Sequence, residues 1–171
     1  MNKRVRNIGM ILLLTIISVP LSGCISGNKK NSKIDSSLDF TLKDINGKTF
    51  NLSDFLGKVI LLNFMTTDCP YCSLEMRELE KVRETTGDDV IIISIDADKS
   101  DTNREIKNTY SKYINKWIFA LDTYKEDVSD KYMVYGVPKN VIINTQGKVS
   151  YSNPGLTSKD ILLNEINKAK I

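Results

Sequence analysis

Two kinds of hydrophobic pattern alternate along most of the chain. Nearly continuous apolar runs of strand length occur in KVILLNFM, DVIIISID and WIFAL, which begin at Lys58, Asp89 and Trp117. Such runs are typical of strands that are buried on both faces. Between them, apolar residues recur at the three- and four-residue spacing of an amphipathic helix. The alternation predicts one domain built on a mixed α/β sheet with helices on both faces.

Three main helices are expected from capping signals and periodicity. The first begins at Pro70, because proline is favoured at the first helical position, and it ends at Gly87. The second follows the capping box TNRE at residues 102–105, and the last begins near Ser158. The residues expected to pack in the core or at its edge are Leu74, Leu79, Val82, Ile106, Tyr110, Tyr113, Tyr132, Tyr135, Ile161, Leu162 and Ile166.

Two hairpins flank this pattern. The dipeptide Asn46-Gly47 lies between two strand-like runs, which is the strongest short hairpin signal. After a short helical stretch at residues 128–132, a second hairpin is expected to follow Pro138 and to turn near Gly147. It adds an antiparallel edge to the sheet.

The N-terminus carries a different pattern. The positive segment MNKRVRN precedes IGMILLLTIISV, an apolar run of twelve residues, which fits a signal peptide and is short for a membrane span. The following LSGC resembles the lipobox of bacterial-type lipoproteins, in which the signal is cut before the cysteine and the cysteine is lipidated. We therefore expect a signal peptide at residues 1–23, lipidation of Cys24, a polar tether at 24–37 and a domain at 38–171.

The alternative is an uncleaved signal anchor, with Cys24 an incidental thiol. Either way, positive residues before the apolar run keep the N-terminus inside and send the rest across the membrane. The expected location is the extracytoplasmic face of the cell membrane, with the lipid bilayer as a partner.

Charge and composition narrow the chemistry. The net charge is +3, but Lys3, Arg4 and Arg6 account for it, so the remaining chain is neutral and nucleic acid is not an expected partner. The chain has no histidine, which excludes Ser-His-Asp and Cys-His nucleophilic machinery within it. Cysteines and carboxylates remain as candidate reactive groups.

The stretch TTDCPYCSLE places Cys69 and Cys72 three positions apart. A disulfide across so short a loop stabilises a fold little, and a zinc site needs two more ligands than this pair supplies. A redox pair explains the placement best, because free amides and the helix dipole stabilise a thiolate at a helix start. Cys69 is then the nucleophile and Cys72 the resolving thiol, while a structural pair and half a metal site are the alternatives.

The stretch FTLKDINGKTFNLSDFLGKVILLNFMTTDCPYCSLEMREL, at residues 40–79, resembles thioredoxin-fold thiol-disulfide oxidoreductases of the TlpA/ResA type, within the redoxin and AhpC/TSA-like group. The resemblance extends from Phe40 to the C-terminus. It implies a thioredoxin-like mixed sheet flanked by helices, with an N-terminal β-hairpin and an insertion between the redox helix and the cis-proline hairpin.

The resemblance also implies roles for individual residues. Val137-Pro138 stands where the family has its cis-proline, which implies that Pro138 lies beside Cys69 and that the Val137 backbone pairs with the substrate segment. Glu75 matches the position of the family's active-site glutamate. The alternative for Glu75 is a solvated acid in the first turns of the helix, favoured by the dipole.

Two positions depart from the family pattern. Asp68 replaces the usual tryptophan before the first cysteine, and its charge is expected to raise the pKa of the Cys69 thiol. Asn63 stands where thioredoxin has a buried acid. The cluster Asp96, Asp98 and Asp101 lacks the glycine and the terminal glutamate of a calcium loop, so we expect a solvated loop there and no metal.

The expected function is that of a membrane-tethered protein thiol-disulfide oxidoreductase. The resemblance implies that it reduces disulfides in exported proteins, for example in cytochrome c maturation, with electrons from a membrane thiol donor and without a cofactor. An oxidant or isomerase would use the same residues.

Two alternatives belong to other classes. Thr66 lies three residues before Cys69, as in thiol peroxidases of the peroxiredoxin-related group, but Leu62 occupies the position of that group's proline. Copper-delivering lipoproteins similar to Sco proteins use a wider cysteine spacing and a histidine, both of which this chain lacks.

Overall fold

The computed structural model describes residues 33–170. The expected signal peptide and Cys24 lie outside the described residues. Among the residues that are described, none of the helices has the length and apolar character needed to cross a membrane.

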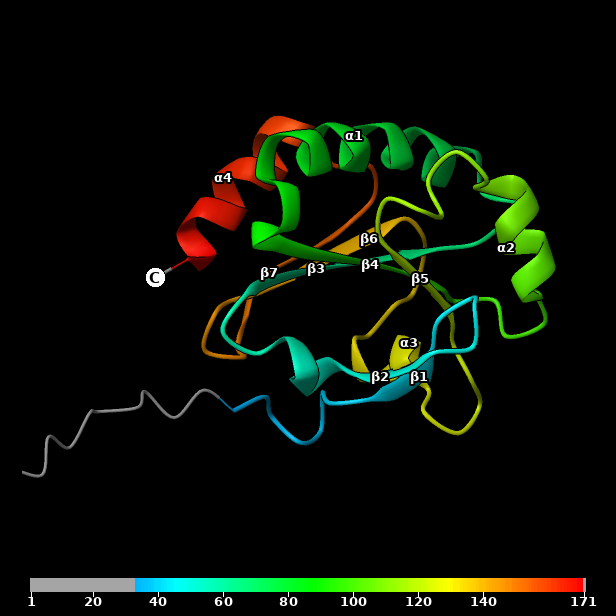
Figure 1. Cartoon of the computed structure of the whole chain (residues 1–171), viewed down its shortest axis with the longest axis horizontal. Helices are drawn as coiled ribbons and strands as arrows, with labels where there is room; N and C mark the ends of the chain where they lie inside the picture. Colours follow the sequence, from blue (N-terminus) through cyan, green and yellow to red (C-terminus); the bar gives the residue numbers. More distant parts are fainter. Residues whose placement is uncertain (1–32, 171) are drawn as a thin grey trace, which may run out of the picture.

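A five-stranded mixed sheet forms the centre of the domain, in the order β5-β4-β3-β6-β7 (Figure 1). Strand β4 pairs in parallel with both β3 and β5, whereas β6 pairs antiparallel with both β3 and β7. The strands are β3 (Val59–Met65), β4 (Val90–Asp96), β5 (Ile118–Leu121), β6 (Lys139–Ile143) and β7 (Val149–Pro154). The expected mixed sheet with an antiparallel final hairpin is confirmed.

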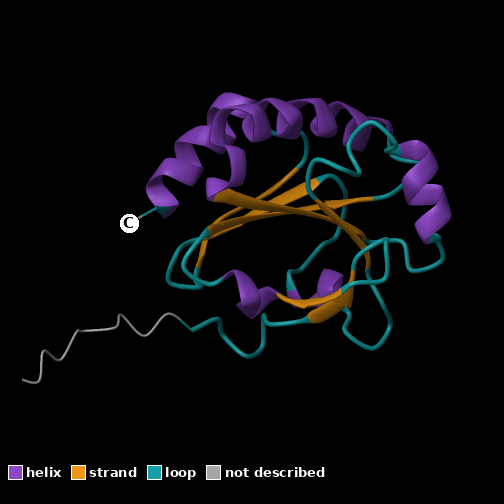
Figure 2. Cartoon of the chain, viewed as in Figure 1, coloured by secondary structure: helices purple, strands orange, loops and turns teal. Residues whose placement is uncertain are grey.

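Helices and a small hairpin cover the two faces of this sheet (Figures 1 and 2). On one face lie α1 (Pro70–Thr86) and α4 (Lys159–Ala169), with α2 (Asn103–Thr109) near the β5 edge and η2 (Gly87–Asp89) after α1. The other face carries the predicted N-terminal hairpin. The hairpin consists of β1 (Thr41–Lys43) and β2 (Thr49–Asn51), and the short helices η1 (Leu52–Phe55) and α3 (Val128–Lys131) lie on the same face.

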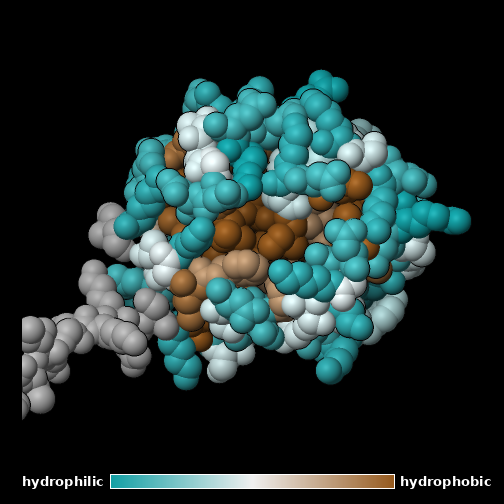
Figure 3. All heavy atoms as spheres, in the orientation of Figure 1, coloured by the Kyte–Doolittle hydropathy of each residue, from teal (hydrophilic) through white to brown (hydrophobic). Residues whose placement is uncertain are grey.

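The burial of β3 explains its nearly continuous apolar sequence. Leu61 and Met65 pack with the core under α1, whereas Leu62 and Phe64 pack with the core under the hairpin. Because side chains alternate between the faces of a strand, a strand covered on both faces is apolar at consecutive positions. Figure 3 shows apolar side chains gathered at the level of the sheet, between polar outer surfaces.

The N-terminal hairpin is closed where the sequence predicts. Gly47 adopts a φ of +89° in the turn, a left-handed conformation that glycine accepts without steric cost. The packing extends further towards the N-terminus than the hairpin, because Ile34 is only 4% exposed and belongs to the core on that face. Ile34 lies in the segment that the sequence assigns to the tether.

Three of the residues expected in the core are instead exposed. On α4, Leu162 and Ile166 face the sheet one turn apart, which turns Ile161 outward to 49% exposure. Leu74 is 40% exposed because α1 buries the side that carries Met76, Leu79 and Val82. Tyr135 is 91% exposed, because it lies in the loop between α3 and β6 and not on a packed helix.

Candidate active site

Cys69 and Cys72 form a disulfide at the start of α1, with their Cα atoms 5.2 Å apart. Cys69 is the N-cap residue of the helix, and Pro70 occupies its first turn as predicted. The backbone N–H of Cys72 donates to the Cys69 sulfur at 3.0 Å. The Cys72 side chain is fully buried, whereas Cys69 is partly exposed. The sulfur that a partner can reach is therefore that of Cys69.

The loop between β3 and Cys69 is held by the side chains of Asp101 and Tyr110, which follow β4 in the sequence. The Tyr110 hydroxyl donates to the backbone oxygen of Thr66 at 2.6 Å. Asp101 accepts hydrogen bonds from Thr67 through the backbone N–H at 3.3 Å and the hydroxyl at 2.8 Å. These contacts hold the residues directly before the disulfide against the end of β4.

Glu75 lies one helical turn after Cys72 and is fully buried. Its Oε1 accepts from Asn140 Nδ2 at 2.9 Å and its Oε2 from the backbone N–H of Thr157 at 2.8 Å. Burial raises the pKa of Glu75 to about 7, although these two hydrogen bonds act to lower it. The alternative of a solvated surface acid is therefore wrong.

A line of hydrogen bonds continues from Glu75 across the sheet. Asn140 of β6 accepts from Asn63 Nδ2 at 3.1 Å, and the two residues pair directly between their strands. Asn63 accepts in turn from Ser94 of β4 at 3.4 Å, and Ser94 accepts from Trp117 Nε1 at 2.9 Å. Buried amides and hydroxyls of this kind are costly unless they are paired, and pairing makes them specify a single arrangement.

Asn140 was not among the predicted site residues. The available signal was a polar residue inside the apolar run KNVII, the same signal that Asn63 gives inside VILLNFM. A lone asparagine in a strand carries no motif, and its partner becomes visible only through the pairing of β3 with β6.

The Val137-Pro138 peptide bond is cis, as the resemblance implies. Phe64 pairs with Lys139, so Pro138 lies at the end of β3 from which the loop to Cys69 departs. The backbone oxygen of Pro138 accepts from the N–H of Gly155 at 2.7 Å. The structure thus brings the cis peptide, the disulfide and Glu75 to the same end of the sheet.

Lys139 fixes the segment that precedes the cis peptide. It is 7% exposed, and its Nζ donates to the backbone oxygens of Tyr132 and Met133, both at 2.8 Å. Desolvation lowers the pKa of this ammonium. The two acceptors lie at the end of α3, so Lys139 joins that helix to β6.

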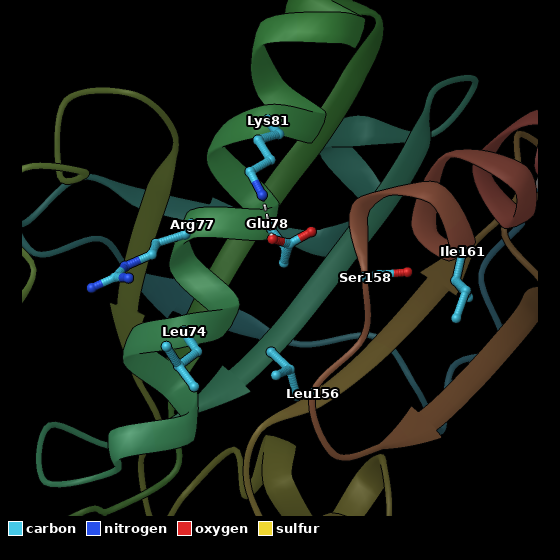
Figure 4. A pocket seen from close by; sticks show the side chains of 7 residues that line it. All are labelled: Leu74, Arg77, Glu78, Lys81, Leu156, Ser158 and Ile161. Atoms are coloured by element: carbon cyan, nitrogen blue, oxygen red, sulfur yellow. Dashed lines mark hydrogen bonds and ion pairs between the residues drawn. The ribbon is translucent and has the colours of Figure 1, made fainter.

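A groove of about 620 Å³ lies between α1 and the start of α4 (Figure 4). Its apolar part is formed by the exposed side chains of Leu74, Leu156 and Ile161. Glu78 stands at its centre, where it pairs with Lys81 at 2.6 Å. The groove borders the helix that carries the cysteines, and its lining residues were not predicted to have a functional role.

Thr66 and Leu62 are the two positions that bear on the peroxidase alternative. The Thr66 hydroxyl donates to Asp68 at 2.8 Å, and Leu62 is fully buried on the face opposite α1. Within residues 33–170, no group of three or more histidine, cysteine, aspartate or glutamate side chains is arranged to hold a metal ion.

Comparison with known proteins agrees with this geometry. The model of the Redoxin family matches residues 29–169. The thiol-disulfide oxidoreductase ResA of Bacillus cereus (strain ATCC 10987 / NRS 248) is 30% identical over 174 aligned positions, which cover 97% of this chain and 98% of that protein.

Solved structures share the fold. The pneumococcal exposed lipoprotein thioredoxin Etrx1 from Streptococcus pneumoniae strain TIGR4 has a TM-score of 0.66 at 25% identity, covering 76% of this chain and 98% of that one. MTB dsbF has a TM-score of 0.72 at 22% identity, covering 81% and 100%. Together with the disulfide at the start of α1, these findings show that the chain belongs to the Redoxin family and is a thiol-disulfide oxidoreductase of the ResA type.

Proposed function

We propose that this protein is a membrane-tethered, extracytoplasmic reductase of disulfides in exported proteins, for example in cytochrome c maturation. The observation that carries the thiol-disulfide exchange chemistry is the asymmetry of the pair, while the reductive direction is what the family resemblance implies. A partly exposed Cys69 caps the helix, while Cys72 is buried with Glu75 one turn away. This arrangement separates the sulfur that attacks from the sulfur that releases.

The proposed reaction uses these two sulfurs in order. In the reduced protein, the Cys69 thiolate attacks a disulfide of the substrate, forms a mixed disulfide and expels one substrate thiolate. Cys72 then attacks the Cys69 sulfur, releases the second substrate thiolate and forms the Cys69–Cys72 disulfide. Two electrons pass to the substrate, and a thiol donor at the membrane returns them through the reverse exchange.

Glu75 is proposed to accept the proton that Cys72 loses when it attacks. A carboxyl group with a pKa of about 7 exchanges protons readily at neutral pH, and Glu75 is buried with Cys72 on the same helix. An ionised Glu75 also disfavours a second negative charge nearby, which keeps Cys72 a thiol until resolution.

Substrate is proposed to lie across the cis peptide. The resemblance to the family assigns pairing with the substrate segment to the Val137 backbone and contact with it to Pro138. Tyr71 lies between the two cysteines and Tyr135 lies two residues before Val137; they are 64% and 91% exposed and offer apolar contact surface to a substrate. The groove beside Leu74 extends this surface along α1.

The proposed location rests on the N-terminal pattern. A positive segment, a short apolar run and LSGC precede the domain, and a lipidated Cys24 or an uncleaved helix would each retain the protein at the membrane. Etrx1, whose name describes an exposed lipoprotein, provides a similar case. Mass spectrometry of the membrane-extracted protein should show an acylated peptide beginning at Cys24, and an intact residue 1–23 segment would rule out cleavage.

Trapping in the native membrane tests the substrate class. Cys72→Ser should leave the nucleophile without its resolving thiol and accumulate mixed disulfides with exported proteins, which reductant releases. Cys69→Ser, the matched control, should trap little. Identification of c-type apocytochromes would support the maturation role, and a broad set of proteins would indicate a general reductase. If Cys72→Ser traps no exported protein where the parent is active, the proposed function is wrong.

A further inference from the structure

Asp96 is a buried acid at the end of β4, beside the loop that leads to Cys69. It pairs with Met65, the last residue of β3, and its side chain is fully buried, so the expected solvated loop is wrong at this position. Its Oδ1 accepts from the N–H of Asp98 at 3.0 Å. Among the buried side-chain nitrogen and oxygen atoms of residues 33–170, Asp96 Oδ2 alone has no hydrogen-bond partner.

The charges around Asp96 favour its neutral form. The titratable groups that act on it are Asp98 and Asp101 in the following loop, and Tyr110 at the end of α2 also interacts with it. The cation of this loop, Lys99, instead pairs with Asp127 at 2.5 Å. Desolvation and the neighbouring carboxylates raise the pKa of Asp96 to about 8.

Asp101 connects this buried acid to the active-site loop. Asp101 is within side-chain hydrogen-bonding reach of Asp96, and its Oδ2 holds both the N–H and the hydroxyl of Thr67. Two ionised carboxylates are both acceptors and cannot bond to each other, whereas a neutral carboxyl group has one hydroxyl donor. The unpartnered Oδ2 of Asp96 is where that donor would reside. One more contact joins the two strand ends, from the N–H of Ala97 to the oxygen of Met65 at 2.8 Å.

We propose that Asp96 is a positioning residue for the Cys69–Cys72 pair: its neutral carboxyl group donates from Oδ2 to the Asp101 carboxylate and so keeps Asp101 in place to bind Thr67. Loss of the proton removes this hydrogen bond and puts two like charges side by side. The Asp101–Thr67 contact then loosens, and the residues before Cys69 lose their fixed geometry. The inference concerns the disulfide itself and is independent of the substrate and location proposed above.

The direct test is a titration of the oxidised full-length protein by nuclear magnetic resonance. The side-chain carboxyl resonance of Asp96 and the amide resonance of Thr67 should shift together, with a shared midpoint near pH 8. Glu75 titrates closer to pH 7 and is distinguished by its own carboxyl resonance. A carboxyl resonance showing Asp96 ionised from pH 5 upward would overturn the proposal.

Variants link the titration to reactivity. Asp96→Asn keeps an acceptor for Asp98 and supplies a permanent donor to Asp101, so the Thr67 shift should lose its step near pH 8. Reduction of the disulfide by 2-mercaptoethanol, corrected for the thiolate fraction of the reductant, should slow above that pH in the parent and not in Asp96→Asn.

Asp98→Asn is the matched control, because it removes the same charge from an exposed carboxyl group whose hydrogen bonds go to Ser100. It should keep the Thr67 step, at a somewhat lower pH, because the Asp98 carboxylate no longer raises the pKa of Asp96. An unchanged step in Asp96→Asn, or a reduction rate with the same pH profile in all three proteins, would contradict the proposal. If Asp96→Asn does not fold, the shared midpoint in the parent decides.

Discussion

Glu75 of α1 and Asn140 of β6 are buried polar residues at positions where the hydrophobic pattern predicts apolar side chains. Each satisfies the other, since the amide of Asn140 donates to the carboxyl group of Glu75. Glu75 was nominated through the family resemblance, because it stands three residues after Cys72 where the family has its active-site glutamate. Its burial was not predictable, because it depends on the Thr157 backbone, 82 positions away, closing over the carboxyl group.

Replacing Glu75 with glutamine is expected to weaken the pH dependence of stability. Burial raises the pKa of Glu75 from 4.5 to about 7, so between these values the native protein holds a proton that the unfolded chain has lost. Its contribution is therefore fully present below about pH 4.5 and falls as the pH rises to 7, by about 3 kcal/mol in total. Denaturant unfolding of the oxidised protein from pH 4 to 8 measures the difference in slope.

The control is Glu84→Gln, which removes a charge from an exposed position on the same helix. It should leave the slope of the parent unchanged. The alkylation rate of the reduced protein should also change its pH profile in Glu75→Gln and not in Glu84→Gln. Equal profiles for both variants would show that Glu75 neither titrates near neutrality nor influences the thiols.

At the scale of single elements, α4 shows which features hydrophobic periodicity predicts and which it does not. Its start near Ser158 and the inward positions of Leu162 and Ile166 are confirmed. Ile161 is adjacent to Leu162, about 100° around the helix axis, so only the orientation of the docked helix decides which of the two is buried. That orientation comes from packing against α1 and the sheet, which the local sequence does not encode.

Leu162→Ala is expected to destabilise the protein by about 3 kcal/mol, because it leaves a cavity under a side chain with no exposed surface. Ile161→Ala, the matched control one residue away, should cost about 1 kcal/mol or less, because its side chain is half exposed. Urea unfolding of both variants measures the difference. Similar losses would mean that α4 docks with a different face against the sheet.

At the scale of the whole molecule, the site forms where the parallel strands β3 and β4 end. The carboxyl ends of parallel strands meet at one edge, which is where open α/β sheets place their functional groups. The disulfide follows β3, Asp96 ends β4, and the cis peptide precedes β6 at the same edge. Strand runs and capping signals were enough to predict the mixed sheet and the helix that carries the cysteines, whereas the cis peptide was implied by the family resemblance.

The side-chain contacts between these segments could not be predicted from the sequence. Asp96, Asp98 and Asp101 look alike in a row of polar residues, yet Asp96 is buried and Asp98 is exposed. The difference arises because the side chain of Asp96 continues the buried face of β4, while the chain turns away at the next residues. Such a distinction depends on where a strand ends, which is the least certain feature of a sequence-based prediction.

The measurement that tests the central claim most directly is a single turnover of the reduced full-length protein with a protein disulfide such as that of insulin, followed by mass spectrometry. The parent should transfer two electrons and finish with the Cys69–Cys72 disulfide. Cys72→Ser should stop as a mixed disulfide through Cys69, and Cys69→Ser should give no such adduct. If instead the substrate disulfide stays intact while peroxide converts Cys69 to a sulfenic acid at a comparable rate, the pair belongs to a peroxidase and the account is contradicted.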